Sequence, residues 1–130
     1  MGDMNVDVIL PCLDEADALP EVLGRLPRGY RAIVVDNGST DGSADVARAH
    51  GALVVTEPVK GFGSACSAGV AAATAEYVAF CDADASMDPA ELVPLVARVA
   101  PGHTDLAPGR RVPTTPGARA PPARVANRVL

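Results

Sequence analysis

The chain has 130 residues and a hydrophobic fraction of 48%, enough for the core of one domain, while aromatic residues make up only 3%. No apolar run reaches the roughly 18–20 residues of a membrane span, and the acidic start lacks the positive region of a signal peptide, so we expect a cytoplasmic protein. The net charge of −5 argues against binding to nucleic acid.

Strand patterns and helix patterns alternate along the chain. In order, they predict a strand at 6–10, a helix at 19–26, a strand at 32–35, a helix around 46–49, a strand at 52–56, a helix at 61–74, a strand at 77–81, a helix at 92–99 and a short strand at 106–107. Pro11 is expected to end the first strand, and Ser39 or Thr40 to cap the second helix. Pro94 is expected to delay or kink the fourth helix.

This alternation predicts a parallel, doubly wound sheet. Right-handed crossovers place the loops that follow the strands on one edge, where ligands bind in such folds. Acidic side chains fall in three of these loops, namely Asp14 with Glu15, Asp36, and Asp82 with Asp84. The sequence therefore predicts a ligand site at this edge.

Asp82 and Asp84 follow an apolar strand two positions apart. Two hard oxygen ligands there can hold Mg²⁺ or Mn²⁺, with substrate phosphates and water completing the shell. A bound cation would neutralise a diphosphate leaving group. A solvated turn is the alternative interpretation of this motif alone.

Asp36 ends the second predicted strand, where its carboxylate can accept hydrogen bonds from a nucleobase or a ribose. Gly38 permits a tight turn, although an Asn-Gly turn with a helix cap would also explain the segment without a ligand. Lys60 and Gly63 lie in a glycine-rich loop before a helix, which leaves room for a nucleotide or sugar beside a cation. Packing alone is the alternative, and a dinucleotide-binding loop is disfavoured because Cys66 replaces its third glycine.

Together these segments resemble family 2 glycosyltransferases, most closely the dolichyl-phosphate mannose synthase type, from Val6 to about Asn127. The matching motifs are, in order, LPCLDE at 10–15, DNGSTDG at 36–42, KGFGSA at 60–65 and DADAS at 82–86. Asp14 stands where Asn is usual, Asn37 where a second Asp is common, and Ser86 where Gln is frequent. The resemblance implies a GT-A-like α/β fold, with a mostly parallel sheet flanked by helices and the C-terminal part missing.

The resemblance also implies roles for single residues. Asp82 and Asp84 would hold the metal, with Asp84 as the catalytic residue. Arg110, Arg111 and Arg124 look like the family's phosphate-contacting positions, which would meet the phosphate or the acceptor. With the loop residues, the expected nucleotide-binding set is Pro11, Leu13, Glu15, Asp36, Gly38, Lys60, Gly63 and Asp82.

We expect residues 1–109 to form the nucleotide-sugar-binding core and residues 110–130 to be an Arg- and Pro-rich loop leading to a missing acceptor half. The first part carries a net charge of −10 and the second +5, so the basic end can attract a phosphate or simply be solvated. Nothing after Asp84 is a convincing general base for a hydroxyl acceptor, whereas a polyprenyl phosphate is already anionic.

The predicted function is metal-assisted, inverting transfer of a sugar from a nucleoside diphosphate sugar to an acceptor, with a polyprenyl phosphate as the candidate. Such an enzyme would be cytoplasmic or peripheral at the inner membrane face. A truncated or remnant nucleotide-binding domain without activity is the main alternative. A sugar nucleotidyltransferase is disfavoured, because the place of its glycine-rich signature holds PCLDE at 11–15.

Overall fold

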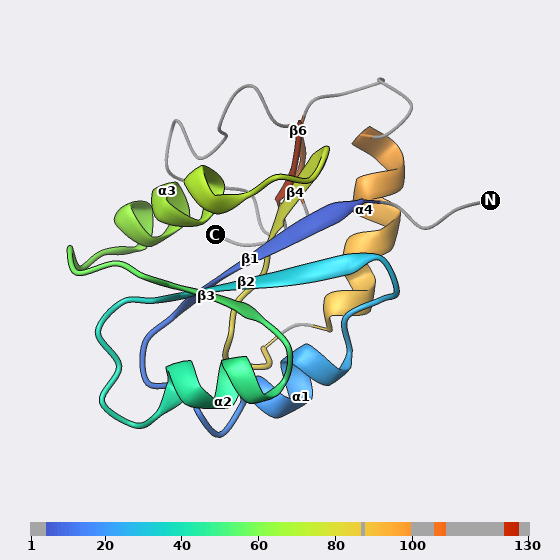
Figure 1. Ribbon diagram of the computed structural model, residues 1–130. Helices are drawn as coiled ribbons and strands as arrows, with labels where there is room; N and C mark the ends of the chain where they lie inside the picture. The colour runs from blue at the N-terminus through green and yellow to red at the C-terminus, as the bar shows by residue number, and fades with distance from the viewer. Residues whose placement is uncertain (1–4, 87, 100–105, 109–123, 128–130) are drawn as a thin grey trace.

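The computed structural model describes residues 5–86, 88–99, 106–108 and 124–127. Its centre is a parallel sheet with the strand order β3-β2-β1-β4-β6-β5 (Figure 1). The strands are β1 (Val6–Cys12), β2 (Tyr30–Asp36), β3 (Leu53–Thr56), β4 (Tyr77–Phe80), β5 (Leu106–Pro108) and β6 (Arg124–Asn127). The helices are α1 (Leu19–Gly24), α2 (Ser43–Ala49), α3 (Phe62–Ala72) and α4 (Leu92–Val99), with a 3-10 turn η1 (Pro89–Glu91) before α4.

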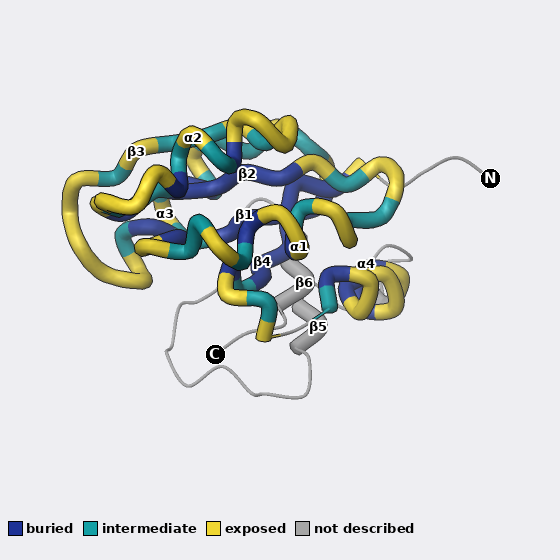
Figure 2. Tube along the Cα trace, turned by 90° about the horizontal axis from the view of Figure 1, so that it is seen from below, coloured by how far each residue is buried: buried dark blue, intermediate teal, exposed yellow. Residues whose placement is uncertain are grey.

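Helices cover both faces of the sheet, because successive residues of the central strands point to opposite sides. On one face α3 packs over a cluster that includes Ile9, Ile33 and Phe80. On the other face α1, α2 and α4 contribute to a larger cluster with Val8 and Leu10. Figure 2 shows β1, β2 and β4 buried between these layers, with the outer sides of the helices exposed. The predicted doubly wound parallel sheet is confirmed.

β1 continues through Pro11 to Cys12, so the prediction that Pro11 ends the strand is wrong. β4 pairs with β1 only as far as Ile9. Beyond that residue β1 has a neighbour on the β2 side alone, where Pro11 lies opposite Val35. A residue without an N–H is tolerated in a strand where one side is unpaired.

The predicted caps of α2 are also wrong. The residue before α2 is Gly42, in a left-handed conformation with φ 85° and without a side-chain cap bond. Instead, Asp41 Oδ1 accepts the N–H of Ser43 at 3.0 Å. Pro94, by contrast, falls in the first turn of α4, where a missing N–H costs no helical hydrogen bond.

Residues 110–130 were expected to form a loop, but four of them form β6. This strand lies between β4 and β5 and pairs in parallel with both. A four-residue strand is too short to show a strand pattern among the prolines around it, whereas the edge of β4 supplies a template that only the folded sheet provides. The boundary between the two predicted parts of the chain remains a prediction.

An ion pair between a buried carboxylate and an Arg side chain that is 45% exposed lies near the amino ends of β1 and β2. Asp7 is 2% exposed and accepts hydrogen bonds from Arg31 Nε at 2.8 Å and Arg31 Nη2 at 3.0 Å. The backbone N–H groups of Thr74 and Ala75 donate to Asp7 Oδ2 at 2.8 and 3.0 Å. The carboxylate therefore joins β1, β2 and the segment between α3 and β4.

Gly69 sets the distance between α3 and the sheet. A Cβ placed on Gly69 would lie 2.4 Å from Ile9 Cγ2, which is closer than real contacts allow. We expect Gly69→Ala to lower the free energy of unfolding by about 1–3 kcal/mol, the usual cost of overpacking, as measured by urea unfolding. Gly63→Ala is the matched control, because a Cβ on Gly63 meets nothing within 4 Å. An equal loss in both variants would contradict this explanation.

Candidate functional site

Three loops leave the carboxyl edge of the sheet next to one another. They are the β1 loop (residues 13–18), the β2 loop (residues 37–42) and the β4 loop (residues 81–86). β1 lies between β2 and β4. The strand order reverses at this point, because β2 and β3 are added on one side of β1 and β4 is added on the other. This switch point is where ligands bind in open α/β sheets.

Hydrogen bonds tie the β1 loop to the β2 loop and to the start of α2. They run from Asp14 N–H to Ser39 Oγ (2.8 Å), from Thr40 N–H to Asp14 Oδ1 (2.7 Å), from Glu15 N–H to Ser43 Oγ (2.9 Å) and from Ala16 N–H to Asp41 Oδ2 (3.0 Å). Asp14 has φ 55°, a left-handed conformation that Asp and Asn adopt more readily than most residues. These bonds hold the backbone of Glu15 against the first residue of α2.

Asp36 is the last residue of β2 and is partly exposed at the sheet edge. Its Oδ1 accepts the N–H of Ser39 at 3.0 Å, which orients the carboxylate within the β2 loop. Gly38 follows with φ 104° and lies next to the end of the Lys60 side chain. The structure thus places Lys60 next to Gly38, two residues after Asp36, and the nucleotide-binding role of these residues stays a prediction.

Asn37 is a site residue whose role the sequence analysis missed. It is 7% exposed, and its Nδ2 donates to the carbonyl oxygens of Glu57 at 2.8 Å and Val59 at 2.9 Å. Its Oδ1 accepts the N–H of Gly61 at 3.0 Å. The Asn-Gly turn pattern concealed this role, because a turn alone explains Asn at this position.

The two carboxylates of the β4 loop are both held by Ser86. The Ser86 N–H donates to Asp84 Oδ1 at 2.9 Å, and its hydroxyl donates to Asp82 Oδ2 at 3.3 Å. Ala85, between Asp84 and Ser86, has φ 65°, a strained conformation for a non-glycine residue of the kind that clusters at functional sites. Asp82 is partly exposed and Asp84 is exposed, so a ligand can reach both.

Electrostatics places Glu15 beside these carboxylates. The pKa of Glu15 is raised by burial first, and then by the negative charges of Asp84, Asp41, Asp82 and Asp14. A cation at this position would relieve the repulsion. The predicted metal ligands and Glu15, although far apart in sequence, therefore share one negatively charged region.

This donor set fits a hard divalent cation. Within the described ranges, no group of three or more His, Cys, Asp or Glu side chains is placed to hold a metal. Asp82 and Asp84 offer two carboxylates that could bind such a cation together with phosphate oxygens and water, which is the usual arrangement for Mg²⁺ with nucleotides.

The remaining predicted residues are only partly brought to this edge. Pro11 is partly buried at the end of β1, and Leu13 is 46% exposed. The pairing of β6 places the backbone of Arg124 opposite Tyr77, at the amino end of β4, so it is not brought to the edge that carries Asp82. Arg110 and Arg111 lie outside the described residues.

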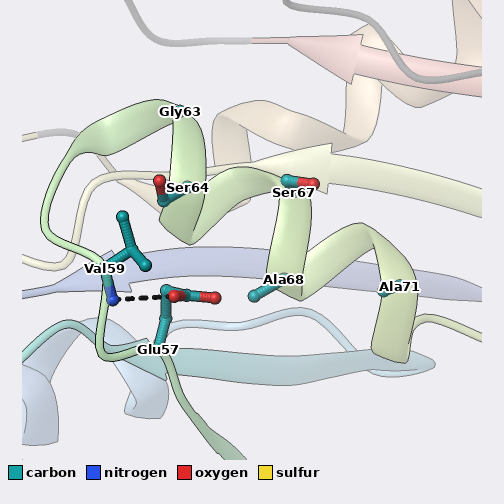
Figure 3. Close-up of a pocket in the computed structure, with 7 residues that line it drawn as sticks. All are labelled: Glu57, Val59, Gly63, Ser64, Ser67, Ala68 and Ala71. Carbon is teal, nitrogen blue, oxygen red and sulfur yellow. Dashed lines mark hydrogen bonds between the residues drawn. The ribbon is translucent and has the colours of Figure 1, made fainter.

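An open groove of about 490 Å³ lies beside the start of α3 (Figure 3). Of the predicted site residues it includes only Gly63, and the three acidic loops lie outside it. Its lining is Glu57, Val59, Gly63, Ser64, Ser67, Ala68 and Ala71.

No helix in the part of the chain with a described structure is long and apolar enough to span a membrane.

Comparisons with known proteins agree with this arrangement. The family model of glycosyl transferase family 2 matches residues 7–124. An uncharacterized glycosyltransferase of Mycobacterium bovis is 57% identical over 113 residues, which cover 87% of this chain and 51% of that protein. An undecaprenyl-phosphate 4-deoxy-4-formamido-L-arabinose transferase of Klebsiella pneumoniae is 34% identical, covering 76% of this chain and 35% of that protein.

Solved structures give the same picture. Glucosyl-3-phosphoglycerate synthase from Mycobacterium tuberculosis, in complex with Mn²⁺ and uridine diphosphate glucose, has a TM-score of 0.64 and 31% identity. The match covers 76% of this chain and 40% of that one. With the parallel sheet flanked by helices, this likeness confirms the predicted GT-A-type fold. The chain spans about half the length of its mycobacterial relative.

Proposed function

The chain belongs to glycosyl transferase family 2, and we propose that it binds a nucleoside diphosphate sugar at the carboxyl edge of its sheet and transfers the sugar to an acceptor. The observation that carries this proposal is the placement of Asp36 and of the pair Asp82 and Asp84 on either side of β1. Neighbouring strands are about 4.8 Å apart, so the ends of β2 and β4 are separated by about 10 Å. This separation suits a nucleoside at β2 and its diphosphate at β4.

The nucleoside would lie against the β1 and β2 loops. The carboxylate of Asp36 is oriented by Ser39 and can accept a hydrogen bond from a base N–H or a ribose hydroxyl. Pro11, Leu13 and Glu15 would form the wall on the β1 side. Because hydrogen bonds already fix these loops to each other, little ordering entropy is lost on binding.

The diphosphate would lie at the β4 loop. Mn²⁺ or Mg²⁺ held by Asp82 and Asp84 would supply charge neutralisation for the diphosphate leaving group. Ser86 holds both carboxylates in place. The similar glucosyl-3-phosphoglycerate synthase, whose structure was solved with Mn²⁺ and uridine diphosphate glucose, supports a divalent metal for this chain.

A polyprenyl phosphate is the acceptor class that we propose. A hydroxyl acceptor needs a general base, whereas the oxygen of a phosphate monoester is already anionic. Asp88, the first described carboxylate after Asp84, accepts the N–H of Ala90 at 3.0 Å and caps η1, which is a structural role. The undecaprenyl-phosphate transferase relative supports this acceptor, which would place the protein at the inner face of a membrane.

A nucleotide-binding domain without transfer activity is the second candidate. It is favoured because the described carboxylates of the β4 loop and η1 are few: Asp82 and Asp84 are the proposed metal ligands and Asp88 caps η1. Only Glu91, an exposed residue of η1, is left there as a general base. A transfer assay with radiolabelled uridine and guanosine diphosphate sugars and polyprenyl phosphates distinguishes the two. Labelled lipid product supports transfer, and nucleotide binding without product supports the second candidate.

Asp36→Ala is expected to weaken nucleoside diphosphate binding about tenfold to a hundredfold, the cost of losing a hydrogen bond to a charged group. Isothermal calorimetry with UDP and GDP in the presence of Mn²⁺ measures the change. The circular dichroism spectrum should be retained, because the Asp36 side chain is partly exposed. Asp45→Ala, at a side chain 90% exposed on α2, is the control for a lost charge. Unchanged affinity in Asp36→Ala would reduce Asp36 to a turn residue.

A further inference from the structure

The segment from Glu57 to Gly61 is held against the sheet by a buried side chain. Both N–H bonds of the Asn37 amide go to carbonyl oxygens of this segment, and its oxygen accepts the N–H of Gly61. An aspartate of the same size could accept from Gly61 but has no N–H to offer the two carbonyls. The segment therefore requires the amide group of Asn37, and another side chain of the same size would not make the same hydrogen bonds.

Two further contacts fix the same segment. The N–H of Glu57 donates to the carbonyl oxygen of Asp36 at 2.9 Å. The Glu57 carboxylate turns back and accepts the N–H of Val59 at 2.8 Å, on the side of the groove beside α3 (Figure 3). Gly61 has φ 132°, which other residues rarely adopt. Lys60 is thus bracketed by two residues, Val59 and Gly61, that both bond to Asn37.

This arrangement places the Lys60 ammonium over the β2 loop. A Cβ on Gly38 would lie 3.3 Å from both Cε and Nζ of Lys60, so the amine rests where Gly38 has no side chain. Lys60 is exposed, and it forms no ion pair with any residue of described structure. The ammonium is therefore a donor that a ligand at this edge can use.

The position of Lys60 favours the nucleoside over the diphosphate. Gly38 lies two residues after the end of β2, whereas the carboxylates of the β4 loop lie two strands away. Two strand spacings amount to about 10 Å. An ammonium over Gly38 would thus meet a base carbonyl or a ribose hydroxyl rather than a phosphate bound at Asp82 and Asp84.

We propose that Asn37 is a positioning residue, which fixes Lys60 so that its ammonium donates a hydrogen bond to an oxygen of the bound nucleoside. This inference rests on the proposed function, since it concerns the same nucleotide site. Asn37 acts through Lys60 and does not itself touch the ligand.

The test is a double-mutant cycle on nucleotide affinity. Lys60→Met and Asn37→Ala are each expected to weaken binding about tenfold, for the free nucleoside as well as for its diphosphate. The double variant should bind as the single variants do, because Asn37 acts through Lys60. Calorimetry with uridine, UDP, guanosine and GDP in the presence of Mn²⁺ gives these values.

Three outcomes would overturn the assignment. Losses that multiply in the double variant would mean that Asn37 has a general structural role. A loss seen with the diphosphates and not with the nucleosides would move the Lys60 contact to phosphate. Wild-type affinity in Asn37→Asp would mean that the two amide N–H bonds are not needed. Arg48→Met, which removes a positive charge from α2, is the matched control and should leave affinity unchanged.

A measurement without ligand separates this inference from the proposed function. Amide hydrogen exchange of residues 57–61 should become faster in Asn37→Ala while exchange in β1 and β4 stays as in the wild type. Unchanged exchange at 57–61 would overturn the role of Asn37 whatever the ligand. If exchange responds as expected but the wild-type protein binds no nucleotide, the proposed function fails and the Lys60 contact fails with it.

Discussion

Asp84→Asn is expected to remove most of the gain in UDP or GDP affinity that Mn²⁺ provides, a loss of about a hundredfold. Changes to residues that only support a metal ligand already cost about 10- to 100-fold in metal affinity, and the loss of a ligand should cost at least as much. The Asn side chain keeps the size and the acceptor for the Ser86 N–H but brings no negative charge to the cation. Calorimetry with and without a chelator measures the gain.

The control for this prediction is Glu76→Gln. It removes one negative charge from an exposed residue before β4, at the edge opposite the β4 loop. We expect its response to Mn²⁺ to equal that of the wild type. Nucleotide affinity that does not depend on the cation in the wild-type protein would exclude the metal role of Asp82 and Asp84, whatever the variant shows.

The largest loss of stability is expected for Asp7→Ala. This change removes the acceptor for Arg31 and for two backbone N–H groups at a position 2% exposed. The Arg31 side chain is 45% exposed and can be solvated, so the loss comes mainly from the two backbone N–H groups left without an acceptor. An unsatisfied buried donor costs about 1–3 kcal/mol, and urea unfolding should show a decrease of about 2–4 kcal/mol. Asp45→Ala, with a side chain 90% exposed in its own pair with Arg48, should cost about 0.5 kcal/mol or less.

The contribution of Asp7 should depend on pH. Burial alone would raise the pKa of this carboxyl group, but the hydrogen bonds from Arg31, Ala75 and Thr74 outweigh it and hold the pKa below its ordinary value. The contribution is therefore full above the ordinary carboxyl pKa of about 4 and is lost as the pH falls through the lower folded value. The difference in unfolding free energy between wild type and Asp7→Asn should be constant from about pH 7 to pH 5 and shrink below about pH 4. A difference that stays constant below that pH would contradict this explanation.

Much of the fold could be predicted because the apolar pattern of the strands is explicit. The runs 6–10, 32–35 and 77–81 are almost entirely apolar, as strands buried on both faces must be, and they became β1, β2 and β4. β6 was not predictable, because it depends on the unpaired edge of β4 rather than on its own four residues. Pro11 was misjudged for a similar reason, since its tolerance depends on where β4 stops pairing.

The candidate site shows the same division. Asp36, Asp82 and Asp84 could be predicted because each directly follows an apolar strand, and topology then sends the strand ends to one edge. Asn37 acts through hydrogen bonds to residues that lie near it only in the folded chain. Ser86 acts through a local turn that brings its N–H to Asp84. A sequence pattern does not show such contacts, and Asn, Gly and Ser are common in turns that bind no ligand.

The place of β6 in the sheet also has a consequence for the order in which the protein folds during synthesis. β1 to β4 can pair once residue 80 has left the ribosome, but the outer edge of β4 waits for residues 124–127. β5 precedes β6 in the chain and yet reaches the sheet only through it. For more than 40 residues of elongation, the nascent chain therefore presents a fully apolar strand with an open edge, the kind of surface on which molecular chaperones act.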